Sequence, residues 1–384
     1  MRAVRSKKVK RRKKIQYFDY SLLAVIIFLM CFGLVMLFSS SSYSAQVELG
    51  DSMFYLKKQG LISIGSFVIM LGVSRIDYHI YAKYAKMLYW VSIFLMALVQ
   101  TPLGVESNGS KRWLGIAGQR IQPSEIAKVA VILFIPVVLC EIGKKISKKE
   151  GIIKVLIWGG FSAACVFFLT DNLSTAVIVM GITCIMIFVV HPKTAPFMKI
   201  LAAAGVAVIA LVGFLSASGS LSSNFRLRRI MVWLHPEDFA SSWGYQVMQG
   251  LYAVGSGGFF GKGLGNSVQK MVIPEVQNDM ILSVICEELG VFGAIIILVL
   301  FGMLLYRLMF IAQNAPDMYG SLIATGIFAH IALQVILNVA VVINLIPTTG
   351  ITLPFISYGG TSILFLMIEM GIALGVSRTI RFEE

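Results

Sequence analysis

The sequence predicts an all-α integral membrane protein with ten membrane-spanning helices and one long extracytoplasmic loop that carries short interfacial helices. Two observations predict this class. Of the 384 residues, 57% are hydrophobic and 14% are charged, against roughly 45 to 50% and 25% in soluble domains. The apolar residues also gather in segments close to the ~20 residues that cross a bilayer. A water-soluble globule is excluded, because so few polar residues cannot cover a compact body.

The chain begins with a basic tail, residues 1–19, in which nine of the first fourteen residues are Lys or Arg. Such a run beside membrane spans favours a cytoplasmic anchor, and no nucleic-acid partner is expected. Residues 20–380 are predicted to form a single membrane domain. Its ten apolar segments are 20–38, 59–74, 87–103, 122–141, 153–170, 173–191, 197–217, 280–306, 319–343 and 358–377.

An even number of spans places both termini on one side of the membrane. Most of the 33 basic residues then lie in the tail and in loops on that side, which the positive-inside rule assigns to the cytoplasm. We therefore expect a multi-pass protein of the cytoplasmic membrane with both termini inside. The remaining basic residues concentrate in or near 107–128 and 218–279, where they could hold an anionic ligand or meet lipid headgroups.

Residues 218–279 form the long extracytoplasmic loop, and its aromatic content argues against disorder. An apolar stripe predicts a short interfacial helix on which Gln246 and Gln249 share another face, aimed at a headgroup or a sugar. The stripe consists of Val247, Leu251 and Val254. Glycines at 255–265 surround Lys262. They could cradle a phosphate or simply form turns, but no strand precedes them, which excludes a dinucleotide fingerprint.

Ionisable side chains within spans are candidates for function, because burying charge in lipid is costly. Glu125 and Lys128 lie three residues apart on the fourth span and so share a face. They are either a structural ion pair or a pair that orients a substrate phosphate. Asp279 begins the eighth span. It could cap the helix, act as a general base or hold a divalent cation.

Other polar residues within the spans and the segment before the last span have the following expected roles. Glu287 lies ~12 Å beyond Asp279 along the helix, too far for a carboxylate dyad, and Glu288 is expected to pack against a neighbouring helix. Glu369 has no partner that the sequence identifies. Gln334 and Asn338 share a face of the ninth span, as interhelical contacts or as a site. In 346–360, two prolines and three glycines prevent a continuous helix, so cavity-lining backbone is expected there.

Four segments together resemble the SEDS family (shape, elongation, division and sporulation) of membrane-embedded peptidoglycan polymerases, and the resemblance extends over nearly all ten spans. They are NGSKRWLGIAGQRIQPSEIAK at 108–128, GYQVMQGLYAVGSGGFFGKGLGNSVQK at 244–270, PEVQNDMILSVICEELG at 274–290 and IPTTGITLPFISYGGTS at 346–362. The sequence LPFISYGG at 353–360 and the basic tail resemble the FtsW and sporulation branch more than the RodA branch.

The resemblance implies a glycosyltransferase that polymerises lipid II, an undecaprenyl-diphosphate-linked disaccharide-pentapeptide, on the outer face of the membrane during septal wall synthesis. It implies Asp279 as the essential aspartate, with Glu125, Lys128 and Arg112 matching further family residues. We expect Asp279 to deprotonate the acceptor 4-hydroxyl, and basic residues to neutralise the diphosphate, aided by a divalent cation, Mg²⁺ or Mn²⁺, for which Asp279 is the candidate ligand.

The full set of expected substrate-binding residues is Arg112, Gln122, Gln246, Gln249, Lys262, Lys270, Ser357 and Tyr358. One segment departs from the family. The family has Pro-Asp-x-Gly-Thr before the sixth span, whereas this chain has Asp-Asn-Leu-Ser-Thr at 171–175, so the role of that carboxylate is not carried over.

Two other functions share the same features. A lipid II flippase or transporter would also need ten spans, buried charges and a headgroup site, and a scaffold for division proteins would need polar contacts for assembly. The enzyme is favoured because the candidate charges concentrate at the outer face, whereas transporters often hold them near the bilayer midplane. The resemblance also implies a class B penicillin-binding protein, a transpeptidase, as partner, together with other division proteins.

Overall fold

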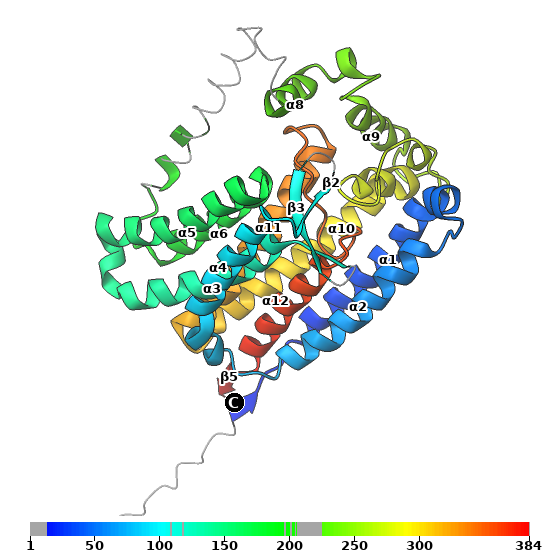
Figure 1. Ribbon diagram of the computed structural model, residues 1–384. Helices are drawn as coiled ribbons and strands as arrows, with labels where there is room; N and C mark the ends of the chain where they lie inside the picture. Colours follow the sequence, from blue (N-terminus) through cyan, green and yellow to red (C-terminus); the bar gives the residue numbers. More distant parts are fainter. Residues whose placement is uncertain are drawn as a thin grey trace, which may run out of the picture.

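The computed structural model describes residues 14–107, 110–116, 119–195, 197–199, 202–203, 205 and 225–383. Over these residues the chain is mainly helical, and its long helices run side by side in one bundle (Figure 1). The long helices are α1 (Tyr20–Leu49), α2 (Phe54–Val73), α3 (His79–Leu98), α4 (Pro123–Ile142), α5 (Lys149–Thr170), α6 (Leu173–Val190), α10 (Ile281–Asn314), α11 (Met318–Val342) and α12 (Ser362–Ser377).

These nine helices coincide with nine of the ten expected spans. In the described part of the chain, seven helical segments are long and apolar enough to cross a membrane, and α12 is a shorter apolar helix. Helix α3, which contains Lys83 and Lys86, is not among the seven. Most of the expected span at 197–217 lies outside the described residues. The chain is therefore a multi-pass membrane protein, as predicted.

Some helix boundaries differ from the prediction. Helix α1 continues past residue 38 through four serines and ends at Gly50, which adopts a left-handed conformation with φ 73°. The continuation holds because Ser39 turns inward and donates to Glu288. Helix α3 begins at His79, eight residues before the expected start, because Lys83 and Lys86 interrupt the apolar run without interrupting the helix.

Two small sheets were not expected. The first is a meander of β2 (Gly104–Ser107), β3 (Ser110–Ile116) and β4 (Gln119–Ile121) between α3 and α4, all antiparallel. The second pairs the two ends of the described chain, β1 (Lys14–Gln16) with β5 (Arg381–Glu383). The end of the bundle where β1 and β5 meet is called the terminal end below (Figure 1).

The opposite end of the bundle, called the loop end below, carries the short helices of the predicted interfacial loop (Figure 1). They are α8 (Phe225–Leu234), η2 (Pro236–Phe239), α9 (Tyr245–Ser256) and η3 (Gln269–Met271). Helix α9 buries Val247, Gly250 and Ala253. The predicted short helix is present, but of its predicted apolar stripe only Val247 is buried, whereas Leu251 and Val254 are half-buried. Residues 343–361, called the 343–361 segment below, are not helical and join α11 to α12.

Helix α10 is interrupted at Gly290, which has φ 68° and ψ −169°, and the glycine-rich segment fills the interruption. The amides of Lys262 and Gly263 donate to the carbonyls of Glu287 and Glu288, each at 2.9 Å. In return, the amides of Val291 and Phe292 donate to the carbonyls of Gly258 and Phe259, at 3.0 and 3.1 Å. The backbone groups that the break exposes are thus satisfied by the loop.

The close approach explains why glycines are needed here. A Cβ on Gly257 would lie 1.9 Å from the carbonyl oxygen of Cys286, and one on Gly261 would lie 2.2 Å from that of Glu288. Of the two readings of this segment, a phosphate cradle or turns, the structure shows turns whose amides at Lys262 and Gly263 bind α10.

Candidate functional site at the loop end

Asp279 lies in the loop just before α10, where three other elements meet it. From α9, Gln246 Nε2 approaches the carboxylate Oδ1 at 3.4 Å. From α11, Asn338 Nδ2 donates to the backbone carbonyl of Asp279 at 2.9 Å. From the 343–361 segment, Gly350 borders the carboxylate, because a Cβ built there would lie 4.0 Å from Asp279 Oδ2.

The surrounding protein raises the pKa of the Asp279 carboxyl above its ordinary value. The largest cause is desolvation, and the negative charge of Glu275 adds to it. The positive charge of Arg229 and the hydrogen bond from Gln246 act in the opposite direction, but do not offset the burial. A carboxylate with a raised pKa is a stronger base than an ordinary aspartate, so it is better suited to accept a proton near neutral pH.

Arg229 on α8 is a site residue that the sequence did not single out. Its guanidinium donates to the carbonyl of Thr348 at 3.1 Å and is close enough to Asp279 to lower the pKa of its carboxyl. The preceding Arg228 stacks over the ring of Trp243 at 4.8 Å. The excess of basic residues at 218–279 was the available signal, but it did not distinguish one arginine from another.

Glu125 and Lys128 form a buried ion pair on α4. Lys128 Nζ lies 2.9 Å from Glu125 Oε1, and both side chains are almost fully enclosed. The helix begins with Pro123 directly before them, and Gln122, the residue preceding the helix, donates to Ser124 Oγ at 3.0 Å. No hydrogen bond or ion pair between described residues joins this pair to Asp279, so the two groups are separate parts of the loop-end half of the bundle.

Arg112 lies on β3, and its guanidinium donates to the carbonyl of Asp171 at 3.1 Å. The segment that departs from the family pattern therefore contacts a predicted site residue. Asn172 caps α6 through the amide of Thr175, at 3.0 Å. Ser174 then donates to the carbonyl of Thr349 at 2.8 Å, which connects this segment to the 343–361 segment facing Asp279.

Lys262 and Lys270 both form ion pairs within the protein. Lys262 Nζ lies 2.7 Å from Glu287 Oε1, and Lys270 Nζ lies 3.1 Å from Glu288 Oε1. Both carboxylates are completely buried, and Glu288 also accepts from Ser39 of α1. The structure therefore places these lysines in contacts that fasten the loop to α10, and not beside Asp279.

The remaining predicted residues lie around the 343–361 segment and α9. Ser357 Oγ accepts from the amide of Leu353 at 2.8 Å and closes a local turn. The amide of Tyr358 donates to the carbonyl of Gln277 at 2.9 Å, which ties this segment to the loop that carries Asp279. Gln249 is half-buried on α9, one turn beyond Gln246.

Glu369, which had no partner in the sequence reasoning, contacts His330 in the bundle interior. Oε2 of Glu369 lies 2.7 Å from Nδ1 of His330, and both side chains are buried. The partner was not found because it lies 39 residues away on α11, and its proximity depends on how α11 and α12 pack.

No group of three His, Cys, Asp or Glu side chains that could hold a metal ion occurs among the residues with described coordinates. Asp279 would therefore have to share a cation with oxygens of the substrate. This arrangement suits Mg²⁺, which is commonly bound through one or two carboxylates and substrate phosphates. The donor set fits a substrate-dependent cation better than a permanent metal centre.

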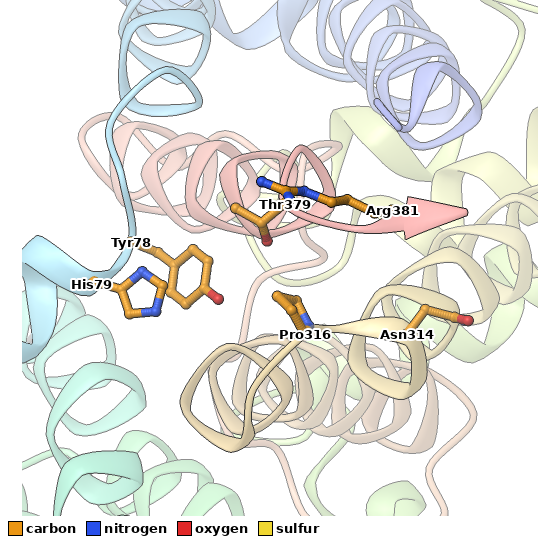
Figure 2. A pocket seen from close by; sticks show the side chains of 6 residues that line it. All are labelled: Tyr78, His79, Asn314, Pro316, Thr379 and Arg381. Atoms are coloured by element: carbon orange, nitrogen blue, oxygen red, sulfur yellow. The ribbon is translucent and has the colours of Figure 1, made fainter. Parts of the chain in front are cut away.

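A small cavity of about 400 Å³ lies at the terminal end (Figure 2). It is lined by Tyr78, His79, Asn314, Pro316, Thr379 and Arg381. None of the residues that the sequence predicts for the site belongs to it, and it is at the end of the bundle opposite Asp279. It is therefore a different feature of the molecule.

The fold and the buried charges define a polytopic membrane protein with a polar site at one end of its helix bundle. Residues 20–381 match the family of cell cycle proteins that comprises FtsW, RodA and SpoVE, and the chain belongs to this family. Stage V sporulation protein E of Bacillus subtilis is 39% identical over 369 residues, covering 95% of this chain and 98% of that protein.

Another relative in sequence and two solved structures are similar to this chain over almost its whole length. A probable peptidoglycan glycosyltransferase FtsW of Geobacter sp. (strain M18) is 35% identical, covering 96% of this chain and 99% of that protein. A chain from a peptidoglycan synthase complex that coordinates polymerization and crosslinking superposes with a TM-score of 0.76 at 23% identity, covering 94% and 98% of the two chains. RodA of Thermus thermophilus superposes with a TM-score of 0.68, also at 23% identity, covering 94% and 97%. The expected family, including its division and sporulation branch, is confirmed.

Proposed function

We propose that this protein is a peptidoglycan glycosyltransferase that polymerises lipid II into glycan strands for septal wall synthesis. Relatives that match almost the whole chain carry the name of this activity. The observation that carries the proposal is Asp279, a carboxylate with a raised pKa that is held between α9, α11 and the 343–361 segment at one end of the bundle.

In the proposed reaction, Asp279 accepts the proton of the acceptor 4-hydroxyl, because a neutral sugar hydroxyl is a poor nucleophile. The hydroxyl oxygen bonds to the anomeric carbon of the donor while the bond from that carbon to the lipid diphosphate breaks. The lipid diphosphate leaves with the electron pair, and the proton on Asp279 returns to solvent. A positioned base contributes roughly 10²- to 10⁴-fold to such a step.

Cationic groups would stabilise the departing diphosphate. The positive charge of Arg229 lowers the pKa of Asp279. We therefore add Arg229 to Arg112 and Lys128 as a candidate for binding the diphosphate. Lys262 and Lys270 could contribute only by exchanging their glutamate partners for phosphate. A divalent cation, Mg²⁺ or Mn²⁺, would supply further neutralisation of the diphosphate, and Asp279 is the residue that would be its ligand.

The remaining proposed contacts to the sugars and the headgroup come from Gln122, Gln246, Gln249, Ser357 and Tyr358. We further propose that the loop end faces outward and that both termini are cytoplasmic, as the distribution of basic residues predicts. The matched synthase complex couples polymerization to crosslinking, which supports a crosslinking partner here, a class B penicillin-binding protein.

The test is reconstitution with purified lipid II, with and without Mg²⁺ or Mn²⁺ and the transpeptidase, followed by separation of glycan ladders on a gel. We expect Asp279→Asn to lose ladder formation. The matched control is Glu237→Gln, which neutralises an exposed carboxylate of the same extracytoplasmic loop and should keep it. Parental polymerisation by folded Asp279→Asn would refute the assignment.

A lipid transporter remains the second candidate, and one observation favours it. The buried pair of His330 and Glu369 is an ionisable group inside the bundle, as expected of a translocation pathway. A flipping assay with labelled lipid in vesicles separates the two functions. Transport that is abolished by Glu369→Gln, in a protein that forms no glycan ladder, would favour the transporter.

A further inference from the structure

Asn338 connects the loop that carries Asp279 to the 343–361 segment. Its side chain is completely buried. The single nitrogen Nδ2 donates to two backbone carbonyls, that of Asp279 at 2.9 Å and that of Ile351 at 2.7 Å. Because an amide nitrogen carries two hydrogens, one side chain satisfies both carbonyls.

The orientation of this amide is fixed by its neighbours. Both groups that face the nitrogen are acceptors, so rotating the amide by 180° would place Oδ1 against two carbonyl oxygens. In the observed orientation Oδ1 is buried without a hydrogen-bond partner in the described protein. The protein therefore leaves one polar atom unsatisfied in order to keep the two carbonyls bonded.

Both carbonyls need this donor because neither segment is regular where Asn338 meets it. Asp279 precedes the first residue of α10, Ile281. Ile351 follows Gly350, which has φ 71°, and the 343–361 segment has no helical ladder at this point. Buried carbonyls without a ladder partner require a side-chain or water donor.

A second link between these segments is the hydrogen bond from the amide of Tyr358 to the carbonyl of Gln277 at 2.9 Å. Gly350 borders the carboxylate itself, because a Cβ built there would lie 4.0 Å from Asp279 Oδ2. The spacing between the backbone of Asp279 and that of Gly350–Ile351 therefore determines how much room lies in front of the carboxylate. Asn338 sets this spacing from α11, a 25-residue helix, which is a more rigid support than either loop. Displacements near 1 Å at a reacting group cost about 10²-fold in rate.

We propose that Asn338 is a positioning residue for the glycosyl transfer, and that its amide holds Asp279 at the distance from the 343–361 segment at which the carboxylate meets the acceptor hydroxyl. This inference rests on the proposed function of Asp279 as the base. Asn338 touches neither substrate nor the reacting atoms, and acts through the backbone of Asp279.

The chain offers a matched control on the same helix. One turn away, Gln334 Nε2 donates to the carbonyl of Thr352 at 3.0 Å, the residue after Ile351. Gln334 thus supports the same segment from the same helix, but its hydrogen bonds among the described residues go to Thr352 and not to Asp279. The test compares Asn338→Leu with Gln334→Met, two substitutions that keep the approximate shape and remove the donors.

For Asn338→Leu we expect kcat for lipid II polymerisation to fall by about 10²-fold with KM within about threefold, and the acid limb of the pH profile to move by about half a pH unit or more, because the base has moved. Gln334→Met should change kcat by less than about threefold. Thermal unfolding in detergent checks that both variants fold, and Asp279→Asn is measured beside them.

Three outcomes would overturn the inference: parental kcat in Asn338→Leu, an equal loss in Gln334→Met, or a loss that appears only in KM. If Asn338→Leu gives no folded protein, Asn338→Ser, which retains one donor, replaces it and must show the same selective loss in kcat. Activity of Asp279→Asn would refute the proposed function itself, whereas an inactive Asp279→Asn with an unaffected Asn338→Leu refutes only the positioning role.

Discussion

Lys262 and Glu287 are 25 residues apart in the chain, yet the ammonium and a carboxylate oxygen lie 2.7 Å apart at the break in α10. The same carboxylate accepts from the amides of Val268 and Gln269, each at 3.2 Å. Lys270 and Glu288 repeat the arrangement one residue further along α10. Two neighbouring glutamates thus hold the segment from Lys262 to Lys270 against the helix.

These two ion pairs should differ in strength, because Lys270 is buried whereas the Lys262 side chain is 35% exposed. Removing one partner of a buried pair leaves an unpaired buried charge and costs about 3 to 5 kcal/mol. Removing the partly exposed Lys262 leaves the buried Glu287 with hydrogen bonds from Ser267, Val268 and Gln269, so this loss should be smaller. We therefore expect Lys270→Met to lower the free energy of unfolding more than Lys262→Met, as measured by denaturant unfolding in detergent. Equal losses would contradict this ranking.

Two glycines near the break in α10 should respond to alanine with opposite changes in stability. Gly257→Ala would drive a methyl group into the carbonyl of Cys286 and should destabilise the protein. Gly255 lies in α9 with no atom within 4 Å of a built Cβ, so Gly255→Ala should stabilise it by about 0.5 to 1 kcal/mol, the usual helix preference for Ala. Thermal midpoints measure both, and a tolerated Gly257→Ala would argue against the close backbone contact.

The charges around Asp279 predict opposite shifts in the pH dependence of activity. A base must be deprotonated, so activity is present above the raised pKa of Asp279 and is lost as the pH falls through it. Glu275 raises this pKa, so Glu275→Gln should move the acid limb of the kcat profile to lower pH. Arg229 lowers it, so Arg229→Gln should move the limb to higher pH. Shifts in the same direction would exclude the electrostatic explanation.

The same raised pKa predicts that the base is costly for folding. A carboxyl whose pKa is higher in the folded state contributes stability below its unfolded pKa, and this stability is lost as the pH rises through the folded pKa. At neutral pH the charged Asp279 is therefore destabilising. Asp279→Asn should raise the thermal midpoint at pH 7, with a smaller gain at pH 4, in the protein that has lost polymerisation. A lower midpoint at pH 7 would contradict the burial cost.

His330 and Glu369 should behave as a coupled unit, because each compensates the other inside the bundle. We expect either single leucine substitution to destabilise by about 3 to 5 kcal/mol. The double substitution His330→Leu with Glu369→Leu should cost much less than the sum of the two. A double-mutant cycle of unfolding free energies gives the coupling directly. Additive losses would show that the 2.7 Å contact contributes nothing.

The membrane class and the helices could be predicted because an apolar run near 20 residues is a local property of the chain. The predicted helix boundaries were wrong where a polar run in the sequence is stabilised by contacts with another helix. Helix α1 was expected to end at its serine run, but Ser39 is satisfied by Glu288 on α10. The strands β2–β4 were missed because they are short and lie in a polar loop.

The candidate site was only partly predictable, for a related reason. Asp279 and the pair of Glu125 and Lys128 stand out because charge next to lipid is rare. Which charges pair over long distances depends on helix packing, so Lys270 was assigned to substrate although it contacts Glu288. Asn338 acts through backbone carbonyls, which have no signature in the sequence.

The contacts at the terminal end can form only late in synthesis, because they join the start of α1 to α10, α12 and β5. Asp19 begins α1, and its anchor consists of Arg307 on α10 and Ser377 at the end of α12. At a translation rate of about 5 to 20 residues per second, α12 is synthesised roughly 20 to 70 s after α1. Arg307, which pairs with the Asp19 carboxylate, follows it by 288 residues, and Ser377 follows later still. Helix α1 therefore has to insert into the membrane before the contacts that later secure its first turn can form.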